Sequence, residues 1–248
     1  MAYLLSAWAW IETVALVLVG TPIMLVVFCL TAPFDRGRYI SGRLFRLIGV
    51  ASVKLNPLWR FDTTGHTISD PRRPYVVVSN HESYADIFLI SHLPWEMKWM
   101  SKEAMFKVPF FGWMMRMAGD IAIVRGEKSS TIKAMTTARA LLKAKVSIMM
   151  FPEGTRSRGG EMLPFKDGAF KLALEVGAPI LPLVVWGTRD AMAKGTFRFQ
   201  RARARVRVLP PIDTAGMSLD DVAVLRDRTR AVIDAARSTL AAELAARQ

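Results

Sequence analysis

Cysteine and histidine are both scarce in this 248-residue chain. A single cysteine, Cys29, excludes any intramolecular disulfide. Three scattered histidines and one thiol offer no zinc-ligand spacing, so we expect no metal site. Acidic residues are also few, since 21 Asp and Glu stand against 34 Lys and Arg, for a formal net charge of +13. This imbalance favours anionic partners such as phospholipid surfaces, phosphorylated substrates or nucleic acid.

One long segment near the N-terminus has no charged residue. Thr13–Ala32 runs for about twenty residues, the length that spans a bilayer. The residues before it lack Lys and Arg, and the run is too long for a signal peptide. Pro22 near its middle leaves open whether the segment crosses the membrane or dips into one leaflet. Basic residues follow at once, which by the positive-inside rule places the remaining chain on the cytoplasmic side: Arg36, Arg38, Arg43 and Arg46.

A second helix is predicted over Tyr39–Leu55. Ile40, Leu44 and Ile48 share one face at helical spacing, whereas Arg43 and Arg46 lie on another. A basic amphipathic helix beside a membrane segment is typical of the membrane interface, and packing into a core is the alternative. We therefore expect a two-helix membrane-associated appendage over residues 1–56 and an α/β domain over residues 57–248.

Short apolar strands alternate with helical segments from residue 57 onward. This alternation predicts an α/β fold with a mostly parallel mixed sheet flanked by helices. The segment 197–209 alternates Arg with small or apolar residues, as an edge strand or hairpin with a basic outer face would. The predicted strands are 59–63, 75–79, 98–101, 121–124, 146–151, 180–185 and 204–209. The predicted helices are 83–92, 129–144, 166–176 and 219–245.

The first chemical motif follows the strand that ends at Ser79. Asn80-His81 is followed by Asp86, five positions after the histidine. If Ser83 caps a helix whose first turn holds Asp86, the ring of His81 can fold back onto the carboxylate. A histidine braced by a carboxylate is a possible general base. By itself the pattern is weak, and a helix cap beside a loop histidine is the commoner explanation.

Two further motifs follow predicted strands, where α/β proteins gather their sites. Phe151-Pro152-Glu153-Gly154-Thr155-Arg156-Ser157 combines a strand terminator, a flexible glycine and an arginine suited to phosphate. Gly119–Arg125 leads a short strand directly into Arg125. Three such motifs in this order argue against a chance arrangement.

These motifs resemble those of the glycerolipid acyltransferases related to bacterial 1-acyl-sn-glycerol-3-phosphate acyltransferase. The resemblance covers about residues 75–185. Residues 80–86 match the family's N-H-x4-D block, 119–125 the second block and 151–157 the third, F-P-E-G-T-R-S, throughout. The segment 178–184, with Pro182 in an apolar strand, matches the fourth.

The resemblance implies a role for each matched residue. His81 would be the general base and Asp86 its partner, while Arg125 and Arg156 would bind the acceptor's phosphate. The other implied binding or supporting residues are Glu153, Gly154, Thr155, Pro182 and Lys102. Two positions depart from the family pattern, since Val124 stands where an acidic residue is usual and Glu82 where Gln is frequent. Both departures leave the choice of acceptor open.

The implied reaction is acyl transfer from acyl-CoA or acyl-acyl carrier protein to the sn-2 hydroxyl of lysophosphatidic acid, giving phosphatidic acid. No cofactor or metal is expected, because the thioester is already activated. The expected partners are these two substrates and an anionic membrane surface, but no nucleic acid, and the expected location is the cytoplasmic face of the inner membrane. The alternatives are an acyltransferase with another lysolipid or glycerol-3-phosphate as acceptor, a non-catalytic anion-binding membrane protein, and a metal hydrolase.

Met105–Met115 is either lipid-facing or ordinary core.

Overall fold

A computed structural model describes residues 2–157, 160–193 and 195–246 of the chain. Its centre is a seven-stranded sheet in the order β1-β7-β6-β2-β5-β3-β4. The strands are β1 (Trp59–Gly65), β2 (Val76–Ser79), β3 (Met97–Lys102), β4 (Ile121–Ile123), β5 (Ser147–Met150), β6 (Ile180–Trp186) and β7 (Ala202–Val208). The five strands from β6 to β4 run parallel, and β7 is antiparallel to β6. The predicted mostly parallel mixed sheet is confirmed.

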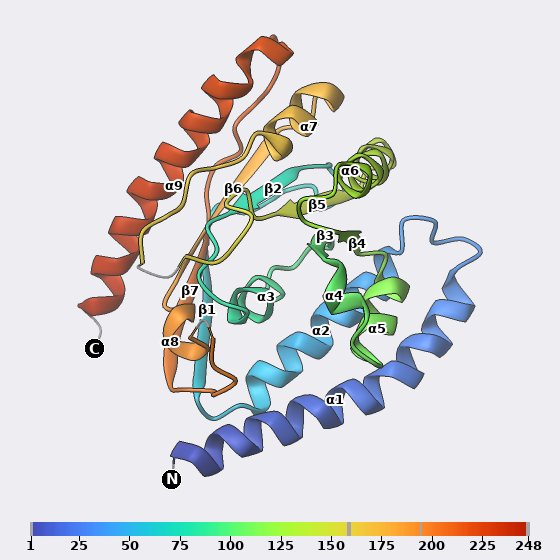
Figure 1. The fold of residues 1–248 in the computed structure, drawn as a ribbon, viewed down its shortest axis with the longest axis vertical. Coiled ribbons are helices and arrows are strands. Elements are labelled where there is room, and N and C mark those ends of the chain that lie inside the picture. The colour runs from blue at the N-terminus through green and yellow to red at the C-terminus, as the bar shows by residue number, and fades with distance from the viewer. Residues whose placement is uncertain (1, 158–159, 194, 247–248) are drawn as a thin grey trace.

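Helices cover both faces of this sheet (Figure 1). The helices are α1 (Ala2–Thr31), α2 (Tyr39–Leu55), α3 (Ala85–Ile90), α4 (Glu103–Phe106), α5 (Phe111–Ala118), α6 (Lys128–Lys143), α7 (Gly168–Val176), α8 (Thr188–Ala191) and α9 (Val222–Ala245), with a 3-10 turn η1 (Leu219–Asp221) before α9. Alternate β2 residues point to opposite faces, as a strand buried on both sides requires. Val76 and Val78 join the core under α6, α7 and α9, whereas Val77 packs with Leu89 and Ile90 of α3.

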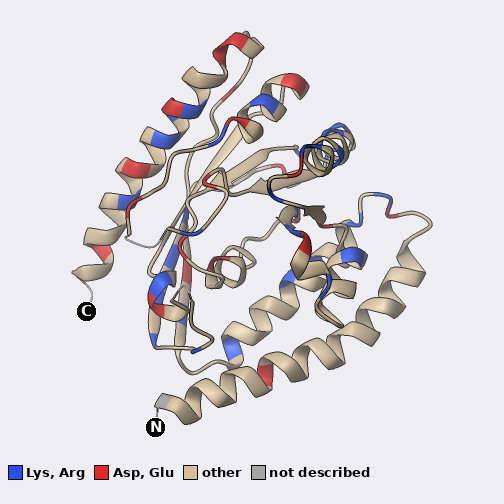
Figure 2. Cartoon of the chain, viewed as in Figure 1, with Lys and Arg blue, Asp and Glu red and all other residues tan. Residues whose placement is uncertain are grey.

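Helix α1 lies along the outside of α2 and α5 (Figure 1). By length and composition, it could cross a membrane over Tyr3–Thr31. Ala9 and Met24 are fully buried on its inner side, while much of the outer side is exposed and apolar, including Ile11 and Leu18. Figure 2 shows α1 almost free of charge, in contrast to the mixed charges of α9. The boundary at residue 56 stays a prediction.

The basic face of α2 points inward, which is the opposite of our expectation. Arg46 is only 4% exposed, and its guanidinium pairs with Asp120, in the turn before β4. Arg43 donates to the backbone carbonyl of Leu93 at 2.6 Å. Ile40, which we placed on a membrane-facing apolar stripe, is 43% exposed. Buried carboxylates beneath the helix explain this orientation, because they compensate a buried guanidinium.

We predicted that the arginine-rich strand would be an edge strand or part of a hairpin. The structure places it inside the sheet. β7 lies between β1 and β6, and β1 forms the edge. Arg207 pairs with Glu243 of α9 at 2.6 Å, and Arg205 lies 2.8 Å from Asp62 of β1. Arg205 and Arg207 are thus covered by carboxylates from neighbouring elements, whereas Arg201 and Arg203 are exposed.

The segment Met105–Met115 divides between the two expected roles. Met114 and Met115 are buried with Phe45 of α2 and Met24 of α1, so both N-terminal helices pack against α5. Trp113, in contrast, is 52% exposed beside α1.

Candidate active site

The motif residues meet at one edge of the sheet because five parallel strands end there. Asn80-His81 follows β2, Phe151 follows β5, Lys102 ends β3 and Arg125 lies just beyond β4. The carboxyl edge of a parallel sheet is where α/β proteins place their sites, since strand ends and helix starts converge there. Asn80 extends the pairing of β2 with β6, as its side chain donates to Val185 O and accepts from Val185 N, both at 2.9 Å.

His81 and Asp86 are in direct contact. His81 Nδ1 lies 2.7 Å from Asp86 Oδ2, and the carboxyl side chain is fully buried. With Nδ1–H donated to the carboxylate, the neutral ring carries its lone pair on Nε2. This is the geometry of a base held in one tautomer.

The local chain path differs from the predicted cap. Helix α3 begins at Ala85, with Tyr84 at the N-cap and no side-chain cap bond there. Ser83 instead accepts from the Ala85 amide through Oγ, and its own amide donates to Asp86 Oδ2 at 3.1 Å. The Asp86 carboxylate thus accepts hydrogen bonds from the backbone amides that precede the helix. These bonds fold the His81 segment back over Asp86.

Both oxygens of the Asp86 carboxylate accept hydrogen bonds. Oδ2 accepts from His81 Nδ1 and from the amides of Glu82 and Ser83, the first amide at 2.8 Å. Oδ1 accepts from the hydroxyl of Thr188, a residue that our sequence analysis did not select. Its only signal is its place just after Gly187, at the end of a parallel strand. Four hydrogen-bond donors hold this carboxylate in one orientation.

The His81 ring is also held by stacking. It lies against Phe151, with ring centroids 3.9 Å apart and planes at 17°. The Ser157 amide donates to His81 O at 3.2 Å, so the first and third motifs are tied together by backbone and by ring. The imidazole is therefore oriented from two sides.

Glu153 contacts the backbone of the loop that carries His81. Its Oε1 accepts from the His81 amide at 2.7 Å, and its Oε2 accepts from the Leu163 amide at 2.8 Å. Burial raises the pKa of Glu153, and these two amides oppose that rise. We had expected this residue to shape the acceptor pocket, and its contacts show in addition how it positions His81.

The cations of the motifs lie at the same edge of the sheet as the dyad. Arg156 lies over the ring of Tyr84, with Cζ 3.8 Å from the centroid, next to the His81–Asp86 segment. Arg125 and Lys102 are exposed at the ends of β4 and β3. Within the described ranges, the side chain of Arg125 makes no hydrogen bond or ion pair, so it is available to an anion. Thr155 is also exposed.

Gly154 and Pro182 support the site through the backbone. Gly154 has φ of +71°, and a Cβ there would lie about 3 Å from the end of Lys166, so the turn favours glycine. Pro182 sits inside β6 beside Val78 of β2, and its carbonyl accepts from Leu209.

Glu82, where the family often has Gln, is buried beside Asp86. Burial, followed by the neighbouring Asp86 carboxylate, raises the pKa of Glu82 to about 8. Arg237 of α9 approaches it at 3.7 Å, and Arg189 also lowers this pKa. Oε1 of Glu82 has no hydrogen-bond partner within the described residues.

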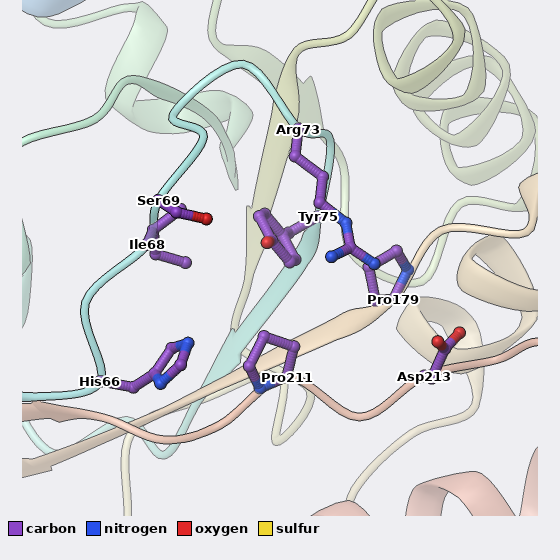
Figure 3. A pocket seen from close by; sticks show the side chains of 8 residues that line it. All are labelled: His66, Ile68, Ser69, Arg73, Tyr75, Pro179, Pro211 and Asp213. Carbon is purple, nitrogen blue, oxygen red and sulfur yellow. The ribbon is translucent and has the colours of Figure 1, made fainter.

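A cavity of about 280 Å³ lies at the other end of the sheet (Figure 3). His66 and Arg73 line it with Tyr75, which precedes β2, whereas the dyad follows β2. His66 therefore lies in a loop remote from the dyad. His92 follows α3, where its ring contacts Phe88 O.

Comparison with known proteins agrees with this arrangement. A family model described as Acyltransferase matches residues 60–186, just over half of the chain. The 1-acyl-sn-glycerol-3-phosphate acyltransferase alpha of Ovis aries is 36% identical over 213 residues, covering 85% of this chain and 74% of the relative. The human protein of the same name is 35% identical over 213 residues, covering 85% of this chain and 75% of the relative.

A solved structure shares the whole fold. It is the 1-acyl-sn-glycerophosphate (LPA) acyltransferase, PlsC, from Thermotoga maritima, with a TM-score of 0.80 and 27% identity. The match covers 97% of this chain and 96% of the other, so it includes both N-terminal helices. The chain is an α/β enzyme of the acyltransferase class. It belongs to the Acyltransferase family, among relatives named for acylation of 1-acyl-sn-glycerol-3-phosphate.

Proposed function

We propose that this protein transfers a fatty acyl group from a thioester to the sn-2 hydroxyl of 1-acylglycerol-3-phosphate, giving phosphatidic acid. The observation that carries the proposal is the 2.7 Å contact between His81 Nδ1 and an Asp86 carboxylate whose oxygens are all engaged. Relatives at 35–36% identity carry this activity in their names.

In the proposed mechanism His81 Nε2 takes the proton of the acceptor hydroxyl. The hydroxyl oxygen attacks the thioester carbonyl carbon, a new C–O ester bond forms, and the C–S bond breaks. The proton on the imidazolium then passes to the leaving thiolate, so the free thiol is released and the base is restored. Asp86 stabilises the imidazolium between these steps. General-base help of this kind is typically worth about 10²–10⁴-fold in rate.

The acceptor phosphate is assigned to the motif cations. Arg156 beside Tyr84 and the exposed Arg125 and Lys102 lie at the same edge of the sheet as the dyad. A guanidinium offers two parallel donors to a phosphate, which orients the glycerol backbone. Glu153, Gly154, Thr155 and Pro182 would hold the loops that carry these groups.

The donor would be acyl-CoA or acyl-acyl carrier protein, and both are anionic partners for a chain of net charge +13. The exposed apolar side of α1 would insert into the cytoplasmic leaflet of the inner membrane, where lysophosphatidic acid resides. The site then lies between lipid and water, within reach of both substrates.

The test is an acceptor panel with the full-length protein in phospholipid vesicles. Radiolabelled acyl-CoA and acyl-acyl carrier protein are each supplied with lysophosphatidic acid, glycerol-3-phosphate or lysophosphatidylcholine. We expect labelled phosphatidic acid as the main product and release of one thiol for each ester formed. Preference for another acceptor would replace the substrate assignment, and binding without transfer would leave only an anion-binding membrane protein.

A further inference from the structure

The second oxygen of Asp86 is held by a residue outside the four motifs. Thr188 Oγ1 donates a hydrogen bond to Asp86 Oδ1, and both residues are fully buried. The other three donors, namely His81 Nδ1 and the amides of Glu82 and Ser83, all lie on Oδ2. Thr188 is therefore the partner of Asp86 that contacts Oδ1.

The fold presents the Thr188 hydroxyl from a rigid turn. β6 ends at Trp186, and Gly187 follows with φ of +90°, where an added Cβ would lie 2.2 Å from Arg203 O. Only glycine fits this reversal, which sends the chain directly into α8. At the far end of α8, the Ser83 hydroxyl donates to Met192 O at 2.8 Å. The first motif and the turn after β6 are thus joined at both ends of α8.

We propose that Thr188 is a positioning residue for the His81–Asp86 dyad. The torsion that rotates a carboxylate about its Cβ–Cγ bond is soft, because it joins an sp³ to an sp² carbon. The three donors on Oδ2 hold that oxygen but leave Oδ1 without a restraint of its own. The Thr188 hydroxyl on Oδ1 fixes the carboxylate plane, so Oδ2 stays aimed at Nδ1 and Nε2 stays aimed at the acceptor. This inference rests on the proposed general-base mechanism.

A buried threonine also fills space, so the test must separate the hydroxyl from the methyl group. Thr188→Val keeps the shape and removes the donor, whereas Thr188→Ser keeps the donor and removes the methyl. Thr229→Val is the matched control, because Thr229 is equally buried and its hydroxyl donates to Leu225 O within its own helix at 2.7 Å. All variants are assayed as full-length protein in phospholipid vesicles with acyl-CoA and lysophosphatidic acid.

We expect Thr188→Val to lower kcat about 10- to 100-fold, because a misaimed base loses transition-state geometry. The KM for the acceptor should change by less than about threefold, since Thr188 lies behind the dyad and not in the acceptor site. Thr188→Ser should keep kcat within about threefold of the wild type, as should Thr229→Val. Thermal unfolding recorded for every variant separates lost activity from lost fold.

Three results would overturn the inference. They are a Thr188→Val enzyme with normal kcat, a Thr188→Ser enzyme that falls as far as Thr188→Val, and a change in acceptor KM with kcat intact. If Thr188→Val does not fold, Thr188→Ser against Thr188→Cys makes the same comparison, because a thiol of similar size is a weak donor. Equal kcat in that pair would also reject the role.

His81→Ala is assayed alongside, so that the two proposals fail separately. Full activity in His81→Ala would remove the general-base mechanism and the role of Thr188 with it. An inactive His81→Ala beside a normal Thr188→Val would remove the role of Thr188 alone.

Discussion

Two buried polar clusters lie at the sheet, one beyond the end of β2 and one around β3, and they are built differently. In the dyad cluster, formed by His81, Asp86 and Thr188, both carboxylate oxygens of Asp86 accept hydrogen bonds. In what we call the α2 cluster, formed by Arg46, Glu96, Lys98 and Asp120, the charges balance but the hydrogen bonds do not. Arg46 Nε, Glu96 Oε2 and Asp120 Oδ2 have no partner in the part of the chain that the structure describes.

The α2 cluster joins the N-terminal helices to the sheet. Arg46 pairs with Asp120, and Lys98 Nζ lies 3.0 Å from Glu96 and 2.7 Å from the carbonyl of Arg38. Burial raises the pKa of Glu96 and lowers that of Lys98, and the mutual attraction of the two opposes both shifts. Charge balance is thus sufficient to fix a helix in place, whereas orienting a reactive ring requires every donor and acceptor to be paired.

Removing the base is expected to have the largest effect on activity. His81→Ala should lower turnover by about 10²–10⁴-fold, because no other group within the described dyad cluster can take the acceptor proton. The thermal unfolding temperature should change little, and vesicle binding should persist. Thr229→Val serves as the buried control. Near-normal turnover in His81→Ala would mean that the dyad cluster is structural, like the α2 cluster.

Breaking the α2 cluster should affect stability more than chemistry. Arg46→Ala leaves Asp120 and Glu96 buried without their guanidinium, which typically costs about 3–5 kcal/mol in the free energy of unfolding. Arg139→Ala is the matched control, since Arg139 pairs with Glu175 at the surface and such pairs are worth about 0–1 kcal/mol. Denaturant unfolding in detergent measures both. Equal losses for the two variants would show that the α2 cluster is no stronger than a surface pair.

Arg156→Ala tests the acceptor side of the dyad cluster. Loss of a charge-assisted hydrogen bond should raise the KM for lysophosphatidic acid by about tenfold or more, with a smaller change in kcat. Arg226→Ala is the control. Arg226 of α9 pairs with Asp227 of the same helix and with Asp167 at the N-cap of α7. A fall in kcat with KM unchanged would place Arg156 among the groups that support the transition state.

The sequence predicted the sheet and the site because each motif follows an apolar strand. Strands that run parallel deliver their carboxyl ends to one edge, so the motif order alone brings Asn80, Phe151 and Arg125 to that edge. The orientation of α2 was beyond this reasoning, because helical periodicity separates two faces without saying which one is buried. Asp120 and Glu96, both far along the chain, decide that Arg46 points inward.

The same limit applies to β7 and to Thr188. Alternating arginines indicate a strand with one polar face, but Glu243 of α9 turns that face into a covered one. Thr188 follows a strand without any motif around it, and its hydroxyl matters only because α3 carries Asp86 to it. These contacts join residues 36 positions apart (Arg207 and Glu243) and 102 positions apart (Asp86 and Thr188), and such contacts leave no local pattern in the sequence.

Glu82 allows the comparison with the smallest expected effect. It is an acidic group beside the dyad cluster, and its Oε1 has no hydrogen-bond partner within the described residues. Its pKa of about 8 in the folded protein lies above the ordinary value of 4.5. Between these two pH values the folded chain holds a proton that the unfolded chain has released, so wild-type stability falls as pH rises from about 4.5 to 8. Glu82→Gln removes this dependence without changing the shape of the side chain.

We therefore expect the unfolding temperature of Glu82→Gln to exceed that of the wild type by an amount that grows between pH 5 and about pH 8 and then levels off. Glu127→Gln, at an exposed position, should follow the wild type at every pH. Thermal unfolding over pH 5–9 measures the difference. A constant offset would mean that Arg189 and Arg237 keep Glu82 ionised in the folded protein.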